Sequence, residues 1–83
     1  MQTGDNTCDV RGLRVDDAWP MVETFLDRSL NQGLRVVFVV HGHGSGALRD
    51  HLREQLHRSR YVTRTRSGNP SEGGEGVTIA WLT

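Results

Sequence analysis

At 83 residues, with 35% hydrophobic and 24% charged residues, the chain suits one small globular domain with a thin core and excludes a disordered tail. A formal net charge of zero does not by itself favour binding to nucleic acid. A single cysteine excludes an internal disulfide and a cysteine-based zinc site, and it is typical of proteins in a reducing cytoplasm. The apolar runs are too short to cross a membrane and the N-terminus lacks the layout of a signal peptide, so no membrane partner is expected.

The first predicted strand is Thr7–Arg11, which follows a polar stretch at residues 1–6 that we expect to be frayed or a non-native remnant. Alternation places Cys8 and Val10 on one face of this strand, opposite its charged residues. Gly12 ends the strand.

The first helix is predicted from about Asp16 to Asn31. If Asp17 caps this helix, Pro20 falls at the third helical position, where no amide hydrogen bond is needed. Gly33 is expected to close the helix in a left-handed conformation. The apolar stripe of the helix consists of Ala18, Val22, Phe25, Leu26 and Leu30.

The run Val36–Val40 is predicted to be a strand in the middle of a sheet, because all five residues are apolar and four are β-branched. Three alternate glycines follow, and then an amphipathic helix from Gly46 to about Arg58. Ser45 is the expected N-cap of that helix.

The C-terminal third is predicted to be two strands joined by a loop. Tyr61–Arg66 alternates like a partly exposed strand, with Val62, Arg64 and Arg66 on one side; 67–76 is a loop by composition, and Val77–Leu82 is the last strand. The order β-α-β-α-β-β with right-handed crossovers predicts an α/β (α+β) two-layer sandwich. Its four-stranded mixed sheet would carry both helices on one face.

The glycine loop before the second helix is a candidate anion site. Free amides and the helix dipole at such a position favour phosphate, although glycines there could serve the turn alone. The loop is neither a Walker sequence nor GxGxxG. Its residues are Gly42, His43, Gly44, Ser45 and Gly46.

Parallel pairing of the first two strands would bring Arg11 and Gly12 to the same sheet edge as His41. There His41 could move a proton, Arg11 could neutralise a phosphodiester oxygen, and Asp9 could orient a partner or hold a metal. Simpler roles are equally available from the residues alone. Asp9 and Arg11 could pair with each other, His41 could only bond the loop, and His43 could be solvated.

Basic residues, all of them arginine, gather in the second half of the chain. Between Arg49 and Arg66 six arginines stand against two acidic residues, which could form an electrostatic footprint for phosphate. The same residues could equally form a solvated helix face with pairs such as Glu54 and Arg58.

Three segments, in order, resemble the signatures of the small MutS-related (Smr) domain family. Residues 8–12 (CDVRG) look like its LDLRG motif, 41–48 (HGHGSGAL) like HGxGxGxL, and 72–78 (EGGEGVT) like the closing GGxGVT. The run 11–23 most resembles the version at the C-terminus of the second bacterial MutS paralogue. By this resemblance, residues 7–83 are predicted to form one Smr domain.

The resemblance implies a fold like the C-terminal domain of a translation initiation factor. It also implies nucleic-acid binding, nicking of DNA or RNA in many members, and suppression of recombination or action on stalled ribosomes. Asp9 and Arg11 match the first motif; His41, Gly42, Gly44 and Gly46 match the second. Some cleaving members have histidine at the position of Arg11, which leaves His41 as the main candidate base.

The sequence therefore predicts a cytoplasmic endonuclease domain of a larger MutS-like protein. The alternative is a non-catalytic module that binds structured nucleic acid or the ribosome surface. A third hypothesis, a domain that binds a small nucleotide, has less support because no residue is an obvious partner for a base or a ribose. No metal ligands are assigned, and magnesium or manganese is the candidate cofactor. The predicted catalytic residues are His41, Asp9 and Arg11, and the predicted nucleic-acid-binding residues are Gly42, His43, Gly44, Ser45, Gly46, Arg14, Arg49, Arg53, Arg64 and Arg66.

Overall fold

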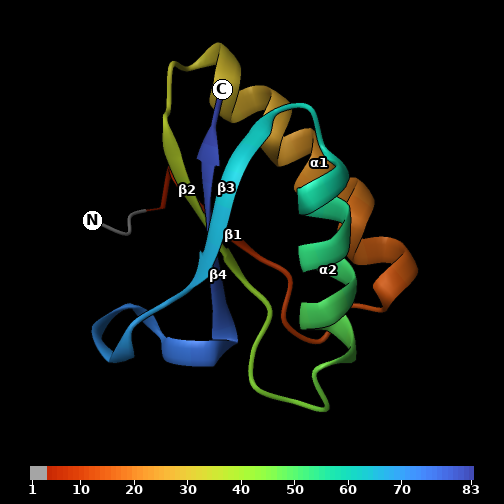
Figure 1. Ribbon diagram of the computed structural model, residues 1–83. Coiled ribbons are helices and arrows are strands. Elements are labelled where there is room, and N and C mark those ends of the chain that lie inside the picture. Colours follow the sequence, from red (N-terminus) through yellow and green to blue (C-terminus); the bar gives the residue numbers. More distant parts are fainter. Residues whose placement is uncertain (1–3) are drawn as a thin grey trace.

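The computed structural model describes residues 4–83 (Figure 1). The predicted order of helices and strands is confirmed, and the loop before the last strand contains two short 3₁₀ turns. The elements are β1 (Thr7–Asp9), α1 (Val15–Asn31), β2 (Val36–Val40), α2 (Ala47–Arg58), β3 (Val62–Ser67), η1 (Pro70–Glu72), η2 (Gly74–Gly76) and β4 (Val77–Leu82).

The four strands form one mixed sheet in the order β1-β2-β4-β3. β1 runs parallel to β2, while β4 is antiparallel to both β2 and β3. The apolar strand β2 is therefore central, as its composition predicts. The parallel pairing brings the carboxyl ends of β1 and β2 to the same edge of the sheet, where Asp9 lies opposite Val40.

Both helices cover one face of the sheet, which confirms the predicted two-layer sandwich (Figure 1). The main core lies between the layers and includes Leu26 of α1, Leu52 and Leu56 of α2, and Val37 and Val39 of β2, all with no exposed surface. On the other face of the sheet a smaller apolar cluster forms. Its buried members are Phe38, Val77 and Ile79, with Val36, Val40 and Trp81 packed against them.

Helix α1 begins within one residue of the predicted start at about Asp16 and ends at the predicted Asn31. At its end, Gly33 has a φ of 78°, the Leu34 amide donates to the carbonyl of Ser29 and the Gly33 amide donates to that of Leu30, which is a Schellman motif. At its start the predicted cap, Asp17, is wrong. Arg14, not Asp17, is the N-cap and makes no side-chain cap, so Pro20 lies inside the helix rather than in its first turn.

Strand β3 carries a bulge that the alternation did not reveal. Val62 pairs with Leu82, yet Arg64 pairs with Trp81, so one extra residue lies between them. Val62 packs on the helix-facing core, whereas Arg64 lies over Trp81 on the other face. The prediction that Val62 shares a face with the strand arginines is therefore wrong.

The N-terminal part of the chain was predicted to be frayed up to residue 6. Residues 1–3 lie outside the described residues. The carbonyl of Asn6 accepts a hydrogen bond of 2.8 Å from the Phe38 amide, so the sheet pairing extends to this residue. Within the part of the chain that the structure describes, no helix is long and apolar enough to cross a membrane.

Candidate functional site

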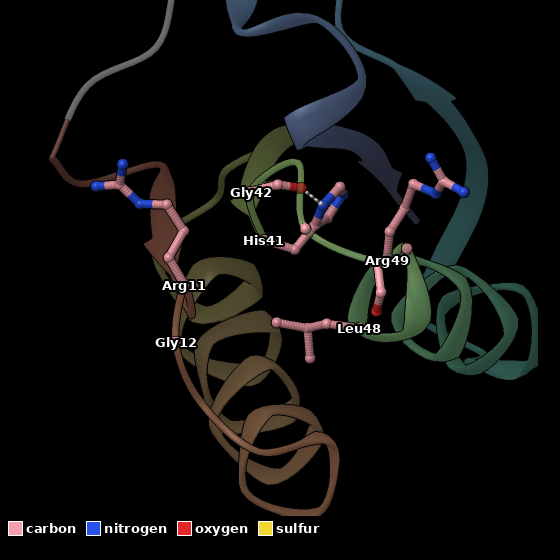
Figure 2. A pocket seen from close by; sticks show the side chains of 9 residues that line it. Arg11, Gly12, His41, Gly42, Leu48 and Arg49 are labelled. Carbon is pink, nitrogen blue, oxygen red and sulfur yellow. Dashed lines mark hydrogen bonds between the residues drawn. The ribbon is translucent and has the colours of Figure 1, made fainter.

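A cleft of about 310 Å³ lies at the carboxyl ends of β1 and β2, beside the start of α2. The structure thus brings the predicted residues Arg11 and His41 and most of the glycine loop to one place, together with Leu48 at the start of α2 (Figure 2). The full lining is Arg11, Gly12, His41, Gly42, Gly44, Ser45, Gly46, Leu48 and Arg49.

The glycine loop needs two of its glycines for their backbone conformation. Gly42 and Gly46 have φ angles of 86° and 89°, a region that costs other residues strain. Gly46, not Ser45, is the N-cap of α2, so the predicted cap is wrong; Ser45 Oγ instead accepts a bond of 3.3 Å from the Ala47 amide. Among residues 4–83 no partner is found for the amides of His43, Gly44, Ser45 and Gly46.

His41 is buried, with 5% of its surface exposed, and both ring nitrogens are hydrogen-bonded. Nδ1 lies 3.1 Å from the Gly42 carbonyl oxygen, and Nε2 lies 2.8 Å from Thr78 Oγ1 (Figure 2 shows the first bond). Because a carbonyl only accepts, Nδ1 carries the proton. Burial lowers the pKa of His41, and the charges of Arg53 and Arg49 lower it further, so the imidazole is neutral at neutral pH.

The segment before β4 is hydrogen-bonded to the start of the glycine loop. The carbonyl of Gly76 accepts from both the His41 and the Gly42 amides at 3.0 Å. A Cβ at Gly76 would lie 2.8 Å from the ring of the exposed His43, so that ring packs close to the Gly76 backbone and would have to move for a side chain there. Gly76 and Thr78 were not among the predicted site residues. Their only signal in the sequence was the third Smr-like motif.

Asp9 and Arg11 form a pair with each other. The Arg11 Nη2 to Asp9 Oδ2 distance is 2.7 Å, and the Nε group donates to the same carboxylate. This pairing with Arg11 holds the pKa of Asp9 below its ordinary value. The stem of Arg11 packs against Gly42, but in Figure 2 its guanidinium points away from His41. Asp9 does not line the cleft.

The two arginines predicted on α2 differ in their surroundings. Arg49 lines the cleft, and its Nε donates to Asp50 Oδ1 at 3.0 Å. Arg53 is turned inward, where its Nε donates to Thr78 Oγ1 at 2.9 Å and its Nη2 to Ser67 Oγ at 2.7 Å. Of these two arginines, Arg49 is therefore the one that can meet a ligand in the cleft.

The remaining predicted arginines lie outside the cleft. Arg14 is an exposed residue at the start of α1. Arg64 stacks on Trp81, with its Cζ 4.0 Å from the ring centroid, and Arg66 pairs with Glu72 Oε1 at 2.9 Å. Both lie on the sheet face that the helices leave uncovered. Among residues 4–83, no group of three or more His, Cys, Asp or Glu side chains is placed to hold a metal ion.

The chain is similar in sequence to curated proteins and matches one domain family. Residues 8–83 match the Smr domain family. The chain is 47% identical over 74 residues to "Endonuclease MutS2" of Anaeromyxobacter sp. (strain Fw109-5), covering 89% of this chain and 9% of that protein. It is 38% identical over 81 residues to "Endonuclease MutS2" of Staphylococcus aureus, covering 98% and 11%. It thus spans about a tenth of the length of these relatives.

Solved structures share the fold. The Smr domain of Thermus thermophilus MutS2 superposes with a TM-score of 0.92 at 38% identity, covering 94% of this chain and 98% of that one. YdaL, a stand-alone small MutS-related protein from Escherichia coli, has the same fold, with a TM-score of 0.92 at 23% identity over 99% of this chain and 67% of that one. Because the family match extends over nearly the whole chain, this protein belongs to the Smr domain family.

Proposed function

We propose that this domain binds nucleic acid by taking phosphodiester oxygens into the glycine-loop cleft. The observation that carries the proposal is the run of unpartnered amides at residues 43–46, which lies at the start of α2 beside Arg49. Amides at a helix start are good partners for an anion, and a guanidinium adds a forked pair of donors. Phosphate is the anion that the backbone of DNA or RNA presents.

Gly44 offers a sharp test of this site. A side chain there would meet no atom within 4 Å, and its φ is not in the left-handed region, so a substitution fits without strain. Gly44→Asp places a like charge where phosphate would bind, which is expected to weaken binding at least roughly tenfold. Gly44→Ala is the matched control and should bind as the wild type does. The measurement is fluorescence anisotropy with labelled duplex DNA, single-stranded DNA and stem-loop RNA.

Equal affinity of the two Gly44 variants would mean that the cleft does not take phosphate. Arg49→Gln supplies an independent check, since loss of one phosphate contact should reduce the slope of log K against log salt by about 0.7–0.9. Arg58→Gln is its control, because Arg58 lies on the same helix but is exposed and paired with Glu54. The three ligands also distinguish DNA from RNA.

Cleavage is a second candidate function, favoured by the position of His41 in the cleft wall and by its neutral state. An attacking oxygen, from water or from the 2′-hydroxyl of RNA, would bond to phosphorus while a ring nitrogen of His41 takes its proton and the P–O bond to the leaving oxygen breaks. Nε2 is the nitrogen without a proton. It could act only after exchanging its bond to Thr78 for one to the attacking oxygen.

A base role predicts that His41→Ala slows cutting by about 10²–10⁴ while binding weakens far less. Supercoiled plasmid and structured RNA, each with and without magnesium or manganese, are the substrates, and circular dichroism checks folding. A folded His41→Ala that cuts at the wild-type rate would remove His41 from the mechanism. Absence of cutting by the wild type under every condition would leave the binding module as the function.

The setting of this activity is also a proposal. The chain covers about a tenth of proteins called Endonuclease MutS2, which supports a domain tethered to a longer MutS-like chain. The buried, unpaired thiol of Cys8 suits the reducing cytoplasm. DNA in recombination and RNA of the ribosome are the two targets that the binding assay separates.

A further inference from the structure

The hydroxyl of Thr78 occupies an unusual position for a central strand. Thr78 has no exposed surface, and its neighbours on β4 are Val77 and Ile79. A valine would have the same shape and would suit such a position better, because a buried hydroxyl loses its bonds to water. The hydroxyl must therefore be satisfied by the protein.

Thr78 Oγ1 lies between two partners from different elements. Arg53 of α2 donates its Nε–H to this oxygen at 2.9 Å, and His41 Nε2 lies 2.8 Å away on the other side. Arg53 is itself held by Ser67 Oγ at 2.7 Å. Arg53 can only donate, so of these two partners Nε2 alone can accept the proton of the buried hydroxyl, and Thr78 donates it to Nε2.

The resulting chain of hydrogen bonds has one direction throughout. It runs from Arg53 to Thr78, from Thr78 to His41 Nε2, and from His41 Nδ1–H to the Gly42 carbonyl. It thereby links α2 and β4 to the first residue of the glycine loop, where Gly42 takes up its left-handed conformation.

We infer that Thr78, oriented by Arg53, is a positioning residue that fixes His41 as the Nδ1-protonated tautomer and so holds the glycine loop in its cleft-lining shape. The effect on the tautomer and the loop stands on the contacts alone, whereas the effect on ligand affinity rests on the proposed function. Thr78 does not itself reach the cleft, because its surface is fully covered.

The charges around His41 favour the same state. Arg53 and Arg49 of α2 and Glu75 of η2 are the charged groups that act on the ring, and the two guanidinium groups outnumber the one carboxylate. A proton on Nε2 would point at the hydroxyl proton of Thr78, and because Arg53 can only donate, that buried hydroxyl would be left without an acceptor. The bonded arrangement therefore requires a neutral imidazole.

The test compares Thr78→Val, which keeps the shape and removes the hydroxyl, with Thr78→Ser, which keeps the hydroxyl. Nitrogen-15 NMR of the imidazole reports the tautomer, with the His41 signals identified from a His41→Asn variant. Hydrogen exchange of the His41 and Gly42 amides, which both donate to the Gly76 carbonyl, reports whether the loop keeps its shape. Anisotropy with a labelled stem-loop RNA and a labelled DNA duplex reports affinity.

In Thr78→Val, Nε2 loses its partner and the ring is no longer held facing the Gly42 carbonyl. We therefore expect a mixture of tautomers, faster exchange of the His41 and Gly42 amides and binding weakened about fivefold, as for the loss of one hydrogen bond. Thr78→Ser should restore all three. A single Nδ1-protonated tautomer and unchanged exchange in Thr78→Val would overturn the inference. If the wild type binds neither nucleic acid, the proposed function fails, yet the tautomer and exchange still decide this inference.

Arg53→Met keeps the test decisive if Thr78→Val does not fold. It removes the donor to Thr78 from a side chain that is partly exposed, so the hydroxyl becomes free to accept from Nε2. The Nδ1-protonated share of His41 is then expected to fall. Arg58→Met on the same helix is the control and should leave the tautomer unchanged. Equal spectra for the two arginine variants would contradict the relay.

Discussion

The glycines of the loop serve different purposes although they lie only two residues apart. Gly42 and Gly46 have left-handed φ angles, which strain any other residue, whereas Gly44 has neither a left-handed φ nor a close neighbour. The sequence pattern of alternate glycines predicts the loop but cannot tell these cases apart. Gly44 is therefore free to serve the ligand, while the other two shape the backbone.

Gly46→Ala is expected to destabilise the fold by about 1–2 kcal/mol, the cost of a left-handed conformation for a residue with a Cβ. The nearest atom to the new Cβ is Nη2 of Arg49 at 2.9 Å, which is the end of a flexible side chain and can move, so strain dominates. Gly44→Ala should change the free energy of unfolding little. Urea denaturation of both variants measures the difference, and equal stabilities would contradict this account of the loop.

His41 shows how far residue-level prediction from the sequence could reach. Its place at the carboxyl edge follows from the strand and the glycines around it. Its partner Thr78 lies 37 positions away, on a strand that pairs with β2 only after the chain has crossed the sheet. A spacing pattern does not carry such a contact, so the hydrogen-bonded state of the histidine could not be predicted.

At the scale of the elements, a sequence signal located some ends of helices and strands correctly and misplaced others: β1 ends at Asp9 rather than at the predicted Arg11. Gly33 closes α1 as expected, because a Schellman motif needs a residue that tolerates a positive φ. The start of α1 lacks a capping side chain, so the sequence does not distinguish the N-cap Arg14 from an aspartate such as Asp17. The bulge in β3 likewise leaves no mark on the alternation of residues, and it decides which face the arginines occupy.

The bulge leads to a prediction about the two strand arginines. Arg66 is held by Glu72 and by the Ser67 carbonyl, whereas among residues 4–83 no acidic partner is found for Arg64, which stacks on Trp81. Arg64→Gln is therefore expected to weaken nucleic-acid binding and to reduce its salt slope by about 0.7–0.9 if this strand contacts phosphate. Arg66→Gln should affect binding less and speed hydrogen exchange in 67–76. Equal losses of affinity would contradict this division of roles.

At the scale of the whole molecule, three segments far apart in the sequence meet at one end of the sheet. The turn after β1 supplies Arg11, β2 leads into the glycine loop, and the turn before β4 supplies Gly76, whose carbonyl accepts hydrogen bonds from the loop (Figure 1). The two-layer fold makes this possible, because parallel pairing of β1 and β2 aligns their carboxyl ends. A short chain thus builds a cleft from loops without adding a further layer.

This arrangement couples the stability of the whole fold to pH through His41. Burial lowers the pKa of His41 in the folded state, whereas in the unfolded chain the pKa is about 6.5. Below that pH, His41 takes up a proton in the unfolded chain but stays neutral in the folded protein, so the free energy of unfolding falls as pH falls. The slope from one group is at most about 1.4 kcal/mol per pH unit, and it ends below the folded pKa.

Two pH windows should therefore be visible in urea denaturation followed by circular dichroism. The first begins near pH 6.5 and belongs to His41. The second lies at more acidic pH, where Asp9, Glu72 and Glu75 lose the partners that lower their pKa values, so stability falls again as they take up protons. His41→Asn is expected to remove the first window and keep the second. His57→Gln, an exposed position on α2, is the matched control. An unchanged slope just below pH 6.5 in His41→Asn would show that the buried imidazole takes up a proton as readily as it does in the unfolded chain. The hydrogen-bonded chain from Arg53 to Gly42 would then not require a neutral ring.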